Sequence, residues 1–574
     1  MTFSAFPPWR PDVSDLDGAH TQRLAGVTPR DDGYGPWPSH EAFTQSLPAT
    51  CRGFFVARHA SGVFIFAGTS ERLYLLDNST LTWQEVSLEG NAYVPLANDA
   101  MWQFAQFNNF VLATHRNELL QRFDMGTPTA FANCPGSPPQ AGSIAIVNRF
   151  VVLSDLDANP NRIKWSGLND TEEWESGTGL SGEQDFPDGG RAMRVAEMSQ
   201  DVGLILQESG WRRMAFLPGN VDLVFQIDKL RDEAGLLAQY SLAVSAGRAY
   251  FLGAKGFMEV AIDGSVTPIG DEMVDRTFLR QANAPQLADL AYDDSHPHIV
   301  LAGTDPRHNR VLWAYKSVTG QEGLFDRVLI YHTTRRRWSP ASFTGEYLAQ
   351  VAKPAITLEG LDPIAPGAIP IVDADDNGSG AIRIEVGSTA TLTTGDHRTI
   401  SGVAGTVEAN GDWFITVVDA THFDLDGSTF SNEYGSGGVV AGNLDLLPFS
   451  LDDVSTAVLP GLAAIDDNHR LGFFSGPPVE ARLETAEQRA EGQRANINNI
   501  WPRTDAETVF GFISKRERLS GAPVDTAPVQ MLEDGNCPLY EEARNGRAGI
   551  LIPAGTEWTF ASGVEIDAEE AGGW

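Results

Sequence analysis

The chain of 574 residues carries 41 Lys and Arg against 76 Asp and Glu, and this net charge of −35 disfavours tight binding to nucleic-acid phosphates or anionic membranes. Its three cysteines lie far apart without a C-x-x-C spacing, which excludes a zinc pattern or disulfide framework and favours assembly in a reducing cytosol. Residues 1–12 show no signal-peptide pattern, and no apolar stretch approaches the roughly 18 residues of a membrane helix, so we expect no membrane insertion.

Residues 1–50 are rich in proline and aromatic residues and show neither a helical nor an alternating strand pattern. We expect an extended arm that lies against a partner, because such a segment has no core of its own; the resemblance given below implies that this arm enters a β-rich platform. The candidate partner-binding residues are Phe6, Trp9, Arg10, Pro11, Asp12, Tyr34 and Trp37.

Residues 51–345 repeat one pattern, an apolar strand followed by a polar turn and a second strand, as in SGVFIFAGTSERLYLLDNSTLTWQEVS at 61–87. A strand-only unit that recurs every 41 to 53 residues is typical of the blades of a β-propeller. We therefore predict an all-β fold with a propeller of about six blades; five or seven blades, or β-sandwiches with accidental spacing, remain alternatives. The strands that mark the pattern contain Phe64, Val111, Val152, Ile205, Phe251 and Val300.

The chain changes character after the propeller. Residues 346–380 have no clear period and are predicted to be a linker that leads from the propeller into another domain. Residues 381–441 contain short strands bounded by Gly, Asn and Asp, which predicts a small inserted β-barrel or sandwich. Residues 442–574 are predicted to form a C-terminal β domain, with either a short helix or a polar crossing loop at 484–496; the resemblance given below implies that the linker returns to a platform and that this domain is part of it.

Motifs for chemistry are scarce, and we expect no enzyme activity and no catalytic residue. Asp373, Asp375 and Asn377 match the start of a calcium loop, but the next glutamate, Glu385, comes one position late. A plain turn is the alternative, and we expect no other cofactor. The basic residues Arg335 to Arg337 are expected to face an acidic surface of a neighbouring copy, with Trp338 packed in a blade.

The termini resemble those of one known family. The motifs are WRPDV at 9–13, GVTPR at 26–30 and GYGP at 33–36, followed by SLPATCRGFFVA at 46–57 and by NGRAGILIPAGTEWTFASGVEIDA at 545–568. Together they resemble the tail nozzle, or tail tube, protein of short-tailed double-stranded-DNA bacteriophages. TLTTGDHRTISGV at 391–403 and VVDATHFDLDG at 417–427 are similar to a small phage module named after a domain of ubiquitin-activating enzyme.

The resemblance implies a structural virion protein whose propeller projects from a platform built by both chain ends. It implies a ring of six copies that conducts and helps retain DNA, contacts an adaptor ring and tail fibres or spikes, and is assembled in the host cytoplasm. From the charge we expect an acidic lumen that passes duplex DNA without tight binding. The alternatives are a receptor- or glycan-binding tail tip and a propeller glycosidase.

Overall fold

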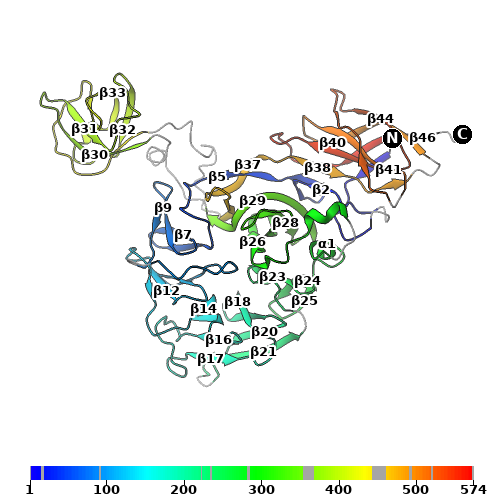
Figure 1. The fold of residues 1–574 in the computed structure, drawn as a ribbon, viewed down its shortest axis with the longest axis horizontal. Helices are drawn as coiled ribbons and strands as arrows, with labels where there is room; N and C mark the ends of the chain where they lie inside the picture. The colour runs from blue at the N-terminus through cyan, green and yellow to red at the C-terminus, as the bar shows by residue number, and fades with distance from the viewer. Residues whose placement is uncertain are drawn as a thin grey trace.

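The computed structural model describes residues 2–14, 19–88, 92–220, 223–232, 235–280, 285–352, 368–441, 460–489, 494–518 and 521–571 (Figure 1). Strands dominate these ranges taken together, and the helical segments are three to six residues long, between 275 and 308 and at 407–409. The predicted all-β fold, with a propeller on a β-rich platform and a small inserted barrel, is confirmed. Among the described residues, no helix is long and apolar enough to span a membrane.

Five consecutive four-stranded antiparallel sheets form blades one to five of the propeller. Their strands are β6 (Phe54–His59), β7 (Gly62–Gly68), β8 (Leu73–Asp77) and β9 (Thr82–Glu85); β10 (Gln103–Phe107), β11 (Phe110–Thr114), β12 (Gln121–Asp124) and β13 (Ala132–Asn133); β14 (Ala141–Val147), β15 (Phe150–Leu156), β16 (Arg162–Trp165) and β17 (Gly182–Asp185); β18 (Ala192–Ser199), β19 (Val202–Gln207), β20 (Gly210–Phe216) and β21 (Phe225–Asp232); and β22 (Ala243–Ser245), β23 (Arg248–Gly253), β24 (Gly256–Ala261) and β25 (Val266–Pro268).

The repeat read from the sequence corresponds to the second strand of each of these blades, because the first five marker residues lie in β7, β11, β15, β19 and β23. The sixth marker, Val300, instead precedes the first strand of blade six. The short helices α1 (Asp275–Phe278), η2 (Pro285–Leu290) and η3 (Pro297–Ile299) are inserted before it and shift the register. Apolar faces meet between blades, as where Phe66 of blade one lies 5.1 Å from Phe123 of blade two.

Blade six continues into a second sheet. It consists of β26 (Leu301–Asp305), β27 (Arg310–Tyr315), β28 (Phe325–His332) and β29 (Arg337–Ala352), with η4 (Pro306–His308) in its first turn. The first half of β29 pairs with β28, and its second half, from Gly345, pairs with β36 (Pro460–Asp466). Next come β37 (Leu471–Pro478) and β5 (Pro38–Ala42). We call the second half of β29 with β36, β37 and β5 the closing sheet.

The closing sheet fills the gap between blades six and one. Side chains alternate along its strands, so that Ala349 and Val351 pack with Ile65 of blade one, while Leu348 packs with Leu312 of blade six. Six blades and this sheet thus complete the ring, and the sheet covers apolar side chains of both blade one and blade six.

One end of the ring axis is filled by side chains. The backbone N–H of Met101, at the entry to blade two, donates to the hydroxyl of Tyr240, at the entry to blade five, over 3.0 Å. Both residues are buried in a cluster with blade six and the closing sheet. Because this contact crosses the ring, the axis is packed here and is not an open passage.

The platform consists of two sheets that share one core. Residues from both ends of the chain interleave in each sheet, in orange, red and blue in Figure 1. One contains β3 (Val27–Pro29), β4 (Tyr34–Pro36), β46 (Ala561–Ala571), β40 (Arg494–Thr504) and β44 (Cys537–Ala543), with β1 (Thr2–Ala5) on β46; the other contains β2 (Leu24–Ala25), β38 (Ala481–Glu484), β45 (Asn545–Ile552), β41 (Phe510–Arg516), β42 (Val524–Asp525), β39 (Gln488–Arg489) and β43 (Val529–Gln530).

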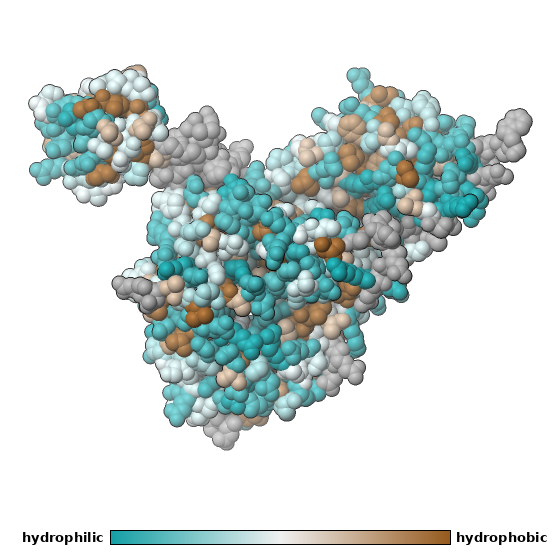
Figure 2. Space-filling view, viewed as in Figure 1, coloured by the Kyte–Doolittle hydropathy of each residue, from teal (hydrophilic) through white to brown (hydrophobic). Residues whose placement is uncertain are grey.

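The inserted module is a closed barrel with the strand order β30-β31-β34-β33-β32-β35, and it stands apart from the propeller in Figure 1. Figure 2 shows hydrophobic residues grouped on its visible face and on that of the platform. The strands are β30 (Ile369–Asp376), β31 (Ile382–Val386), β32 (His397–Ser401), β33 (Gly411–Val417), β34 (His422–Leu425) and β35 (Val439–Val440), with the turn η5 (Val407–Ala409).

Three predicted boundaries need correction. The predicted linker at 346–380 includes the end of β29 and all of β30, so the barrel begins before residue 381; residues 353–367 of that prediction lie outside the described residues. Of the predicted C-terminal domain, β36 and β37 belong to the closing sheet, and residues 442–459 lie outside the described residues. The helix considered at 484–496 is wrong, because β38, β39 and the start of β40 occupy its described part and pair with β45, β44 and β46.

Candidate interaction site at the junction of propeller and platform

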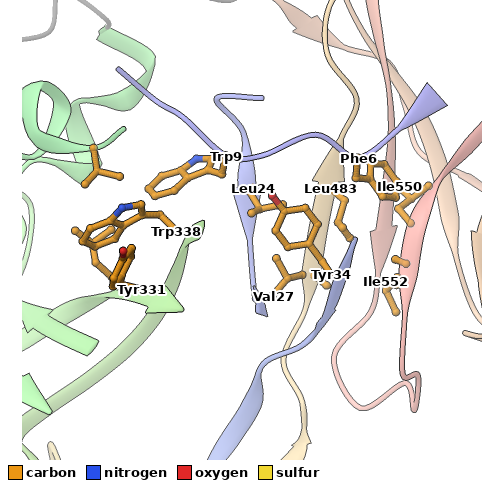
Figure 3. Packing of buried hydrophobic residues seen from close by; sticks show 14 of the residues in the cluster. Phe6, Trp9, Leu24, Val27, Tyr34, Tyr331, Trp338, Leu483, Ile550 and Ile552 are labelled. Carbon is orange, nitrogen blue, oxygen red and sulfur yellow. The ribbon is translucent and has the colours of Figure 1, made fainter. Parts of the chain in front are cut away.

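The N-terminal segment runs along the junction between the propeller and the platform (Figure 3). Trp9 lies beside Trp338 and Tyr331 of blade six, and Phe6 lies beside Ile550 of the platform. All of these residues belong to one buried cluster. The segment therefore joins the propeller and the platform through a single apolar core.

The predicted role of the aromatic residues of this segment as a partner-binding surface is wrong. Phe6, Trp9, Tyr34 and Trp37 are between 0 and 4% exposed within the single chain. Their side-chain polar groups are also used internally: Trp9 Nε1 donates to the Gln22 carbonyl at 3.0 Å, and the Tyr34 hydroxyl donates to the Pro7 carbonyl at 2.9 Å. A segment without a core of its own does take a partner here, but that partner is the distant end of the same chain.

The backbone and one carboxylate of the segment also bond within the chain. The backbone N–H of Arg10 donates to the Thr21 carbonyl at 3.0 Å, and Pro11 is buried. The Asp12 carboxylate accepts the N–H groups of Arg276 and Thr277 at 2.8 and 2.7 Å, so it satisfies two otherwise unpaired donors at the start of α1. Asp12 thereby attaches the N-terminal segment to the propeller.

A second carboxylate, Asp275, lies buried beside this contact. Its Oδ1 accepts the Phe257 N–H at 3.0 Å. The carboxylate fits closely between two glycines, because a Cβ atom on Gly256 or Gly270 would lie 2.0 or 1.9 Å from its oxygens. Burial, with smaller contributions from Asp12 and Asp271, raises the pKa of Asp275 to about 7.

We expect the stability of the junction to depend on the protonation of Asp275. Because its pKa when folded lies above the ordinary value of 3.8, its contribution to stability is fully present below about pH 4 and is lost as the pH rises through about 7. Asp275→Asn keeps an oxygen acceptor for Phe257 and should stabilise the protein at pH 8 by about 2–4 kcal/mol. Urea unfolding at pH 5 and pH 8 measures the effect.

Asp271→Asn is the matched control, because Asp271 is an exposed neighbour of the same site. In Asp271→Asn, most of the wild-type difference in the free energy of unfolding between pH 5 and pH 8 should remain. Equal pH dependence in the wild type and in Asp275→Asn would contradict the assignment.

Two residues of the basic run at 335–337, which was expected to face a neighbouring copy, contact their own chain. Arg335 Nε lies 2.5 Å from Oδ1 of Asp31 in the turn between β3 and β4. The Arg337 guanidinium lies 4.8 Å from the centre of the Tyr34 ring and donates to the Arg30 carbonyl at 2.9 Å. Trp338 packs in the core, as predicted, with 1% of its surface exposed.

The candidate calcium loop does not form. Asp373 and Asp375 are exposed positions in β30, so only Asn377 lies in a turn. Its Oδ1 already accepts hydrogen bonds from the N–H and hydroxyl of Ser379 at 2.9 and 2.7 Å. Within the described ranges, no three His, Cys, Asp or Glu residues are placed to hold a metal ion.

Sequence reasoning missed a buried ionic network in the platform. Glu484 and Glu487, which were considered for a helix, lie with Arg516 and Arg547 in the sheet of β38 and β45. Arg516 Nη2 is 2.6 Å from Glu487 Oε2, and Arg547 Nη1 is 3.6 Å from Glu484 Oε2. These four side chains are at most 8% exposed. The only available signal was that charged residues alternate with apolar ones in EARLETAEQR.

No family model and no curated protein matches the chain. Among solved structures, it is similar to the extracellular domain of the putative hybrid two component system BT4673 from B. thetaiotaomicron, with 9% identity over 61% of this chain and 45% of that one and a TM-score of 0.34. The same domain described as a one component system gives 8% identity, coverage of 67% and 48%, and a TM-score of 0.38.

A third similar structure is the AfRom2 CNH domain, with 10% identity, coverage of 67% of this chain and 97% of that one, and a TM-score of 0.31. The chain spans about half of the length of the two extracellular domains that it matches. At these identities and TM-scores the likenesses support no conclusion about activity or partners.

Proposed function

We propose that this chain is a structural virion protein of a short-tailed bacteriophage, a tail nozzle subunit that assembles into a ring and conducts genomic DNA. The observation that carries the proposal is the platform. The terminal motifs that resemble the nozzle family lie hundreds of residues apart, yet β1 and β4 pair with β46, and β2 pairs with β38. This is the arrangement that the resemblance implies.

The proposed channel lies between copies and not within one propeller. The contact between Met101 and Tyr240 crosses one end of the ring axis of the single chain. A conduit for a stiff polyanion also needs walls that do not hold phosphates, and a charge of −35 per copy supports such walls. The barrel adds to this acidity, because residues 369–441 contain eleven Asp and Glu and two Arg.

The platform offers edges at which copies can meet. Among the described strands, β44 pairs only with β40 and ends one sheet. It carries Tyr540, which is 77% exposed, and Phe3 on β1 is 54% exposed. An exposed edge strand with an apolar side chain is a surface for association. We therefore place the contact between neighbouring copies at β44.

Negative-stain microscopy of the purified protein tests the function and the contact together. We expect rings with a central hole, and a loss of most rings in Tyr540→Ser while the monomer keeps its unfolding temperature. Phe414→Ser is the matched control, because Phe414 is an aromatic residue on the barrel that is 58% exposed. A wild-type protein that stays monomeric at assembly concentrations would contradict the proposal.

Two alternative functions are considered: the first is a receptor- or glycan-binding tail tip, and the second is a propeller glycosidase. Binding to a glycan array without ring formation would favour the first of these. Release of reducing sugar from host polysaccharide would favour the second.

A further inference from the structure

A cavity of about 570 Å³ lies between the turn that joins β3 to β4 and two turns of blade six. We call it the arginine pocket. Its charged lining consists of Arg30, Arg307, Arg310, Arg335, Asp31 and Asp32. Acidic residues outnumber basic ones by 76 to 41 in the whole chain, whereas here four arginines face two aspartates. The lining of the pocket is therefore net positive, whereas the protein as a whole is net negative.

Arg310 has the most incomplete set of partners in this pocket. Its side chain is 15% exposed, and its buried Nε has no hydrogen-bond partner among the described residues. The carboxylate of Asp305 lies 4.0 Å from Nη1, and the same oxygen is held more closely by His308 Nδ1, at 2.7 Å. Burial lowers the pKa of Arg310, which means that its charge is poorly solvated. An additional oxygen acceptor would stabilise it.

Arg335 and His332 complete the polar wall. Arg335 forms two hydrogen bonds with Asp31, but the side chain of Asp31 is 82% exposed, so this pair is open to water and to exchange of partners. His332 is buried, and its pKa is lowered to about 4 by burial first and then by Arg335 and Arg310. The neutral ring adds no charge to the pocket, and its Nε2 accepts a hydrogen bond from Arg335 Nη1.

We propose that the arginine pocket binds an oxyanion, with Arg310 and Arg335 as the principal donors. Guanidinium groups match the paired oxygens of phosphate and carboxylate, which share this chemistry. The two possible sources are free phosphate and the carboxylate of an acidic side chain from a second copy of this chain. The inference does not depend on the proposed nozzle function, because it rests on the cavity of a single chain.

Titration calorimetry of the full chain with inorganic phosphate, at constant ionic strength in chloride, tests the site. We expect saturable binding that Arg310→Gln weakens by about tenfold or more, since a charge-assisted donor is lost. Arg335→Gln, at a side chain that is 30% exposed, gives a second variant if Arg310→Gln does not fold. Arg503→Gln, on the platform and 58% exposed, is the control and should bind as the wild type does.

Sedimentation velocity separates the two sources. Phosphate that binds without changing the oligomeric state identifies a free anion as the ligand. Phosphate that binds and also dissociates associated copies identifies a carboxylate of a second copy. The proposal is overturned if neither phosphate nor acetate binds the wild type, or if both arginine variants bind phosphate with wild-type affinity.

Discussion

Removal of residues 2–42 is expected to leave a chain that does not fold into a closed ring. The truncation takes away β1 to β5, including the outer strand of the closing sheet, which pairs with β37. It also removes Trp9 and Trp37, each 2% exposed. Loss of one buried aromatic side chain costs about 3–5 kcal/mol, and a folded domain has only about 5–15 kcal/mol in total. The truncated chain should lack a cooperative unfolding transition.

Single substitutions measure how much individual side chains of this segment contribute to the free energy of unfolding. Trp9→Ala should lower the free energy of unfolding by about 3–5 kcal/mol, as measured by urea titration. Phe3→Ala, in the same segment but 54% exposed, should cost less than about 1 kcal/mol. A truncated protein that unfolds cooperatively at the wild-type temperature would show that the segment is an appendage and not part of the fold.

Replacement of Arg547 by methionine should be nearly as damaging as the loss of a core tryptophan. The side chain of Arg547 is 3% exposed, and it lies 3.6 Å from Glu484 and 3.4 Å from Glu487, which are themselves buried. Methionine fills most of the space of the arginine side chain, but it removes the positive charge that lies beside the buried carboxylates of Glu484 and Glu487. Breaking a buried ion pair in this way costs about 3–5 kcal/mol.

The matched control is Arg503→Met, at an arginine that pairs with Glu565 on the platform but is 58% exposed. Exposed pairs contribute about 1 kcal/mol or less, so its urea midpoint should stay close to that of the wild type. If the two variants had equal effects, the network around Arg547 would not be isolated from water.

The propeller could be predicted because each blade repeats its own local pattern. Phe64 and Phe251 stand in equivalent strands since both belong to apolar runs bounded by polar turns. The last blade departs from the pattern where α1 and the turns after it are inserted. Calcium binding was suggested by spacing alone, but Asp373 and Asp375 lie in a strand, where alternation places them together on an exposed face.

The contacts of the N-terminal segment could not be predicted from its own residues, because they are made with parts of the chain that are distant in sequence; only the family resemblance implied a platform built by both chain ends. Nothing in residues 1–50 indicates that Leu24 pairs with Leu483 or that Phe3 pairs with Glu565. Glu484 illustrates the same limit, since a charged residue in a polar run suggests an exposed helix until its arginine partners are known. For the N-terminal segment the sequence indicated no core of its own, but the expected partner of its aromatic side chains was another molecule, whereas they are buried within the same chain.

The closing sheet has a consequence for the order of events during synthesis. Blade one is complete once β9 has emerged, yet one of its faces is covered in part by β29, β36 and β37, and the last two are translated hundreds of residues later. At about 5–20 residues per second, the interval is on the order of tens of seconds. During that time the nascent chain exposes Ile65 and its neighbours. Closure of the ring by β36 and β37 is therefore expected to be a late step of folding.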